Sequence, residues 1–270
     1  LMRIRWIDQY KGFLGLLVVI GHTMSWSHAV KAYDVLNLVN FIICSFHMPA
    51  FFVVSGWVSS TNYNFSKVVK KTVNLVVPLC IFWSINVCFS YMSSYYTFWG
   101  AVIKATENYW FIFVMITVII VYPCLRKINS GGVCLGLLLL ATLLTGFVQS
   151  KISMFFGYML CYAVGDIVGK HALEQWGKIQ KRKIFFALCA IVICIIIGYY
   201  TIFEYSLLVN PYYKIFIGIL LSFLTLLIFM DIKVSPLFAS AGNVTLEMYL
   251  MQFIMFSLFS NLTTGNYKLL

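Results

Sequence analysis

The residues of this chain that could do chemistry begin in an apolar opening segment, where Lys11 is followed eleven positions later by His22. In a helix, eleven positions at 100° each bring the two side chains to within about 20° of one face, separated by roughly 16 Å of rise. Asp8 shares this face and can form an ion pair with Lys11 one turn away. An ionisable histidine in the middle of an apolar segment indicates a functional site, since burying it in hydrocarbon costs free energy.

A second histidine, His47, lies beside Pro49 in the apolar stretch 46–56. Proline has no backbone N–H, so we expect the helix to kink or open there and to free a carbonyl near Ser45. If His47 lies at the depth of His22, the pair indicates a polar cavity. The alternative, which the sequence leaves open, is that each histidine is a buried donor satisfied by a neighbouring helix.

Apolar segments that could hold these side chains recur along all 270 residues, of which 62% are hydrophobic and only 10% charged. A soluble domain could not cover its surface with so few polar residues, and the segments lack the alternation of a membrane β-barrel. The sequence therefore predicts an all-α integral membrane protein, one domain over residues 1–270, with about nine to ten transmembrane helices. The approximate spans are 8–27, 37–58, 72–92, 109–125, 133–149, 152–169, 184–203, 212–230 and 236–260.

The net charge of +11 does not indicate a nucleic-acid partner, because most of the 19 basic residues fall in every second loop. By the positive-inside rule this distribution places the amino terminus in the cytoplasm and the protein in the cell membrane, in contact with membrane lipid. The eight cysteines contain no Cys-x-x-Cys pair, and the four histidines are scattered. We therefore expect buried apolar cysteines and no metal.

Several motifs resemble the acyltransferase 3 family of multi-pass membrane enzymes, and most closely its fucose 4-O-acetylase-like branch. In that family a basic residue, ten intervening positions and a histidine mark the first helix, and Lys11 and His22 match this pattern. The resemblance continues through residues 46–56, 70–78, 109–111, 155–158 and 242–250. Two positions differ: Asn74 stands where the family usually has arginine, and Gln252 where it often has histidine.

The resemblance implies transfer of an acetyl or other acyl group from acetyl-CoA or another acyl-CoA to a hydroxyl of a sugar, glycolipid or polysaccharide. His22 is then the general base, although a transient acyl-histidine is an alternative, and His47 orients His22 or the acceptor or holds the oxyanion. A cationic mouth for the phosphates of coenzyme A is expected from the basic residues Lys11, Lys67, Lys70 and Lys71.

The expected acceptor contacts are Tyr109 and Trp110, which could stack on a sugar or on the adenine, and Glu247, which lies in the last predicted span. Glu247 could equally be a structural partner of a buried amide. The main alternative function is a multi-pass transporter of a small solute, for which an inverted repeat would be expected. A non-catalytic membrane partner protein is the third. The acceptor's identity and the oligomeric state are not encoded in any pattern of the sequence.

Overall fold

The computed structural model describes residues 5–26, 34–59, 65–92, 96–128, 130–146, 151–169, 182–189, 191–192 and 211–263. All regular structure within these residues is helical. The elements are α1 (Arg5–Trp26), α3 (Asp34–Trp57), α4 (Phe65–Met92), α5 (Phe98–Asn108), α6 (Trp110–Ile128), α7 (Gly131–Gly146), α8 (Lys151–Val164), the π-helix η1 (Gly165–Gly169), α11 (Pro211–Asp231), α12 (Pro236–Asn243) and α13 (Thr245–Thr263).

These helices cover most of the predicted spans, with two differences. The prediction of one helix over 236–260 is wrong, because α12 ends at Asn243 and α13 begins at Thr245. Between them the N–H of Val244 donates to the carbonyl of Ala241. The expected opening at Pro49 is also wrong, since α3 runs through this residue as one helix. Most of the predicted span 184–203 lies outside the described residues.

Two helices within the described residues are long and apolar enough to cross a membrane by length and composition, namely α4 and α6. Shorter apolar stretches lie in α3, α7, α8, α11 and α13. Both α4 and α6 expose large apolar side chains, among them Val77, Ile81 and Ile120. Such side chains on the outside of a helix suit a lipid environment better than water.

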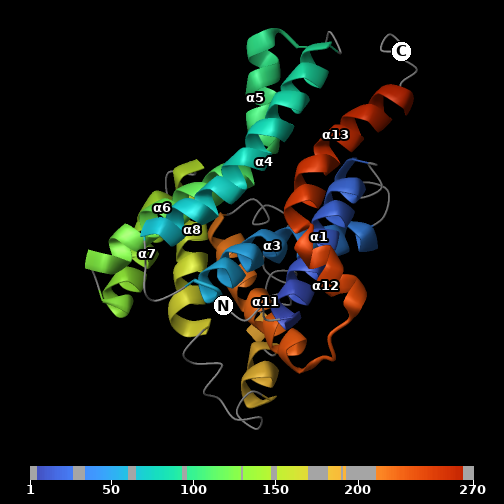
Figure 1. The fold of residues 1–270 in the computed structure, drawn as a ribbon. Helices are drawn as coiled ribbons and strands as arrows, with labels where there is room; N and C mark the ends of the chain where they lie inside the picture. Colours follow the sequence, from blue (N-terminus) through green and yellow to red (C-terminus); the bar gives the residue numbers. More distant parts are fainter. Residues whose placement is uncertain are drawn as a thin grey trace.

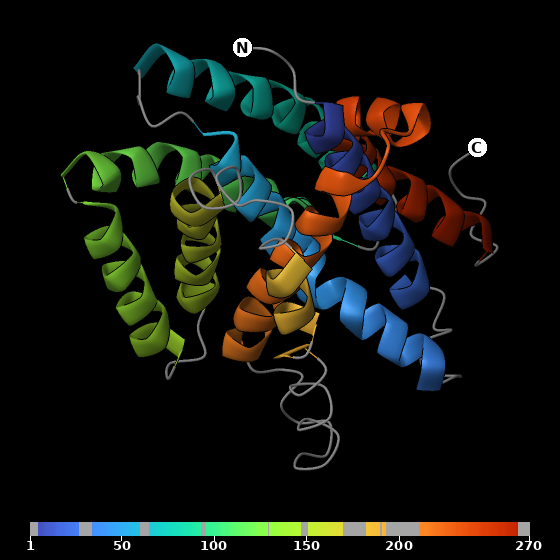
Figure 2. The same cartoon turned by 90° about the horizontal axis from the view of Figure 1, so that it is seen from below.

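The helices pack so that α1 is surrounded by segments from distant parts of the sequence. It contacts α12 most extensively, and also α3, α13 and α11. In Figure 1, α1 lies beside α12 and α13, whereas α6, α7 and α8 form the opposite side of the molecule. Figure 2 shows the same separation from below, with α7 at the edge farthest from α1. The large fully buried side chains come from several of these helices, for example Tyr10, Phe52, Ile112 and Leu250.

Close helix packing depends on glycines that face a neighbouring backbone. A Cβ at Gly12 would collide with the Phe238 carbonyl, and a Cβ at Gly242 with the Asp8 carbonyl, so α1 and α12 approach each other at both positions. Gly56 of α3 likewise faces the backbone of Tyr162 in α8, and Gly165 of η1 faces the backbone of Val53 in α3. Small residues allow this approach in membrane proteins, where dispersion contacts between helices replace much of the hydrophobic effect.

Candidate active site

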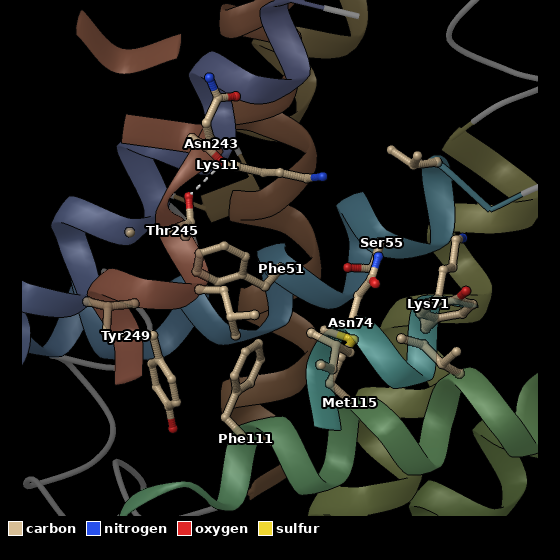
Figure 3. A pocket seen from close by; sticks show the side chains of 18 residues that line it. Lys11, Phe51, Ser55, Lys71, Asn74, Phe111, Met115, Asn243, Thr245 and Tyr249 are labelled. Carbon is tan, nitrogen blue, oxygen red and sulfur yellow. Dashed lines mark hydrogen bonds between the residues drawn. The ribbon is translucent and has the colours of Figure 1, made fainter. Parts of the chain in front are cut away.

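A cavity of about 370 Å³ lies beside α1 and is lined by residues of α1, α3, α4, α6, α8, α12 and α13. The lining includes Asn243 and Thr245, the residues on either side of Val244. Figure 3 shows its side chains, with Lys11 reaching into the space and Phe51, Phe111 and Tyr249 forming an aromatic side. The polar and basic lining residues are Lys11, Ser55, Lys71, Asn74, Asn243 and Thr245.

Two of the four predicted donor-binding lysines meet at this cavity. Lys11 comes from α1 and Lys71 from α4, and their charges are close enough to interact. Two lysines converging on one cavity repel each other, so an anionic ligand placed between them would relieve that repulsion. This arrangement favours an anion-binding role for the cavity.

The other two predicted lysines lie outside the main cavity. Both Lys67 and Lys70 are exposed on α4. Lys70 borders a neighbouring cavity of about 480 Å³, and Asn74 lines both cavities. Lys67 lies close enough to Lys71 for their charges to interact. These two residues can therefore contribute to the field near the mouth without lining the site.

His22 is partly buried and does not line the cavity, although it shares a helix with Lys11. Its ring meets Phe253 edge-on, with 5.5 Å between ring centroids. Phe253 in turn packs at 5.5 Å against Tyr249, which does line the cavity. Two ring contacts, through Phe253 and Tyr249, therefore connect His22 to the lining of the cavity that Lys11 enters.

His47 is buried, with 5% of its surface exposed, and its Nδ1 is bonded to the carbonyl of Ile43. A carbonyl only accepts, so Nδ1 carries the hydrogen and Nε2 is left as the acceptor nitrogen. The His22 and His47 rings are close enough for their charges to interact. The structure thus brings the two predicted histidines into one region and gives His47 a defined tautomer.

The remaining predicted residues are dispersed. Asp8 borders a neighbouring cavity of about 360 Å³ with Arg5, rather than the main cavity. Tyr109 is fully buried, and its hydroxyl donates to the Leu250 carbonyl at 3.0 Å. Trp110 is partly buried and packs at 5.5 Å from the ring of Tyr158.

The placement of Glu247 as a charge inside the last span stays a prediction. Because the helix is interrupted at Val244, Glu247 lies in the first turn of α13, where its side chain is exposed. An acidic residue in the first turn interacts favourably with the helix dipole. This gives Glu247 a local structural role, and it does not line the main cavity.

Asp166 is a buried acidic residue with two charged or polar neighbours. It is 1% exposed and lies in the π-helix η1. Tyr122 donates a hydrogen bond to it at 3.0 Å, and the Nε of Arg126 lies 3.6 Å from the same carboxylate oxygen. Its charge also interacts with that of Lys71, so this buried acid belongs to the electrostatic surroundings of the cavity.

Sequence reasoning also missed most of the polar lining. Ser55, Asn243 and Thr245 each stand next to a glycine or a helix break, where α3, α12 and α13 come closest to their neighbours. Glycines inside apolar helices were the available signal, because they mark close backbone approach.

One protein-family model, described as an acyltransferase domain, matches residues 4–268 of the chain. No curated protein and no solved structure matches.

Proposed function

Because the chain belongs to the acyltransferase domain family and is an O-acyltransferase, we propose that it moves an acetyl group from acetyl-CoA to a hydroxyl of a sugar or surface polysaccharide. The single observation that carries the donor part of this proposal is the meeting of Lys11 and Lys71 at one cavity. Their charges match the phosphates of coenzyme A, and the apolar and aromatic lining suits the less polar pantetheine arm.

The proposed setting is a membrane with the amino terminus in the cytoplasm. Members of the family are membrane-associated, and α4 and α6 have the length and composition to cross a bilayer. We place nine to ten spans in the bilayer, on the basis of the apolar segments and the alternation of basic loops. Lys11 then lies towards the cytoplasm, where acetyl-CoA is found, and His22 lies roughly 16 Å deeper along α1.

His22 is proposed as the general base. Its imidazole takes the proton of the acceptor hydroxyl while that oxygen attacks the thioester carbonyl carbon. The carbon–sulfur bond then breaks, and the thiolate of coenzyme A leaves and takes up the proton. The acyl group must travel from the cavity to His22, which contacts the cavity-lining Tyr249 through Phe253. His47, held by Ile43, is suited to position the acceptor or His22 through its Nε2.

The acceptor is proposed to approach His22 from the side opposite the donor cavity. Tyr109 and Phe253 are buried and pack against each other at 5.4 Å between ring centroids, and Trp110 packs beside Phe111 and Tyr158. A sugar acceptor is favoured by the similarity of the opening motifs to the fucose 4-O-acetylase-like branch.

The test is acetyl transfer from labelled acetyl-CoA to membrane glycans by the purified protein in lipid, comparing wild type with His22→Ala. We expect His22→Ala to lose on the order of a hundredfold or more of the transfer rate, the usual contribution of a general base. Thr23→Ala is the matched control, because this neighbouring exposed hydroxyl bonds only its own helix, at the Val19 carbonyl. Wild-type transfer by His22→Ala would refute the proposed base.

A further inference from the structure

Gln252 is a buried amide whose hydrogen-bonding groups are unused. Its side chain is 4% exposed, and neither the amide oxygen nor the amide nitrogen has a hydrogen-bond partner among the described residues. Buried polar groups in folded proteins are nearly always paired, because an unpaired group has given up its hydrogen bonds to water and gained none in return. Both ends of the Gln252 amide are therefore available to a ligand.

The other buried glutamine shows the usual arrangement. Gln9 is 3% exposed, and its Oε1 accepts a hydrogen bond of 2.8 Å from the backbone N–H of Ser235, the residue before α12. Gln9 therefore fixes the entry to α12 on α1. Gln252 has no such contact with the described chain, although it is buried to the same degree, so a structural role of this kind does not account for it.

Helix register places Gln252 at the level of His22. A Cβ at Gly15 would lie 3.0 Å from the Thr245 side chain, and His22 meets Phe253, so α1 and α13 run side by side in the same direction. Gln252 follows Thr245 by seven positions, which is two helical turns and returns it to nearly the same face. It also directly precedes Phe253. Gln252 therefore lies on the side of α13 that faces α1, at the level of His22 and beyond the α13 residues that line the cavity containing Lys11.

A primary amide has a specific chemical requirement. Its oxygen accepts hydrogen bonds and its nitrogen donates two, so a ligand that satisfies both ends must itself donate and accept. Adjacent hydroxyls of a polyol offer both, and so do the amides of the pantetheine arm of coenzyme A. The position of Gln252 therefore decides between them: it lies at the level of His22 and does not line the cavity that contains Lys11, which favours the acyl acceptor.

We propose that Gln252 binds the acyl acceptor beside His22, and that the acceptor is a polyhydroxylated molecule whose adjacent hydroxyls pair with the two ends of the amide. This assignment rests on the proposed function, because it takes His22 as the base. The amide holds one hydroxyl oxygen in place while a neighbouring hydroxyl loses its proton to His22. Gln252 thereby sets which class of hydroxyl compound enters the site.

The test uses Gln252→Met, which keeps the length of the side chain and removes both hydrogen-bonding groups. With the full-length protein in lipid, we expect a higher thermal unfolding midpoint than wild type, because the substitution removes an unpaired buried amide. We also expect at least a tenfold rise in the apparent KM for membrane glycans and an unchanged apparent KM for acetyl-CoA. Gln9→Met is the matched control, and it should lower the midpoint because it leaves the Ser235 N–H unpaired.

A lower unfolding midpoint for Gln252→Met would show that the fold itself uses this amide, and it would overturn the proposal. An unchanged apparent KM for the glycans would overturn it as well. A changed KM for acetyl-CoA alone would move Gln252 to the donor side and refute its assignment to the acceptor. Failure of the wild-type protein to transfer acetyl groups would instead reject the proposed function, which separates the two failures.

Discussion

The ring of His22 meets the ring of Phe253 edge-on, at 5.5 Å between centroids and 75° between planes. This contact joins the first helix of the described chain to the last, and Phe253 in turn packs against Tyr249, which lines the cavity. Of the lysine and the histidine that share one face of α1, Lys11 lines the cavity and His22 does not. Donor binding and proton removal can consequently be tested separately.

Substitution of Lys11 or Lys71 by alanine should weaken donor binding. We expect each to raise the apparent KM for acetyl-CoA about tenfold, equivalent to about 1.4 kcal/mol, because each removes a charge at the cavity. The effect should shrink as salt is added, since salt screens charges that are open to solvent. Lys67→Ala is the control and should change KM much less, because Lys67 is exposed and does not line the cavity. Equal effects at all three positions would contradict the assignment.

Lowering the pH of the assay should reduce acetyl transfer. A protonated imidazole has no lone pair with which to accept the hydroxyl proton, and imidazoles titrate near neutrality. The rate at saturating substrates should therefore fall on the acidic side and level off on the alkaline side. The Thr23→Ala protein should give the same profile. A rate that stays constant through the acidic range would indicate that His22 is not the base.

Gly242→Ala should destabilise the protein by about 1–3 kcal/mol, the usual cost of forcing an extra methyl group into a closely packed contact. The methyl group would collide with the Asp8 carbonyl on α1. Gly136→Ala in α7 is the control, because a Cβ there has nothing within 4 Å. That change should stabilise α7 by about 1 kcal/mol through helix propensity. Thermal unfolding in the same lipid environment measures both, and equal shifts would contradict the packing argument.

Asp166→Asn should destabilise the protein by about 1–3 kcal/mol, because it weakens the contacts of a buried carboxylate with Arg126 and Tyr122. The expected loss is below that for a fully buried pair, since 27% of the Arg126 side chain is exposed. Asp231→Asn, at the exposed end of α11, is the control and should have little effect. In a double-mutant cycle, Asp166→Asn and Arg126→Gln should not be additive; additivity would show that the two residues do not interact.

The sequence was sufficient to predict most of the helices, since they follow from local pattern. Of the four lysines that it singled out, Lys11 and Lys71 line the cavity, and their role in donor binding stays a prediction. The sequence was not sufficient to predict which residues close the site. The spacing of Lys11 and His22 places them on one face of α1. Phe253, which contacts His22, and Tyr249, which packs against Phe253, come from the other end of the chain. Contacts of this range are not visible in spacing.

The same reason explains why the surroundings of two acidic residues could not be read from the sequence. Asp166 is buried because Tyr122, 44 residues earlier, reaches it from another helix, and no local pattern encodes that pairing. Glu247 lies in the first turn of α13 because the helix is interrupted at Val244. Hydropathy alone predicts residues 236–260 as one continuous apolar segment. Local propensity decides where helices form, whereas packing between distant helices decides which charges become buried.

The close contact between Gly12 on α1 and α12 also has a consequence for biosynthesis. α1 leaves the ribosome early, but the helix that covers its glycine face is made only after residue 236. The hydrogen bond between the Tyr10 and Thr225 hydroxyls likewise spans 215 residues. The cavity, to which α12 contributes Gly242 and Asn243, can therefore be completed only late in synthesis, after α12 has been placed beside α1.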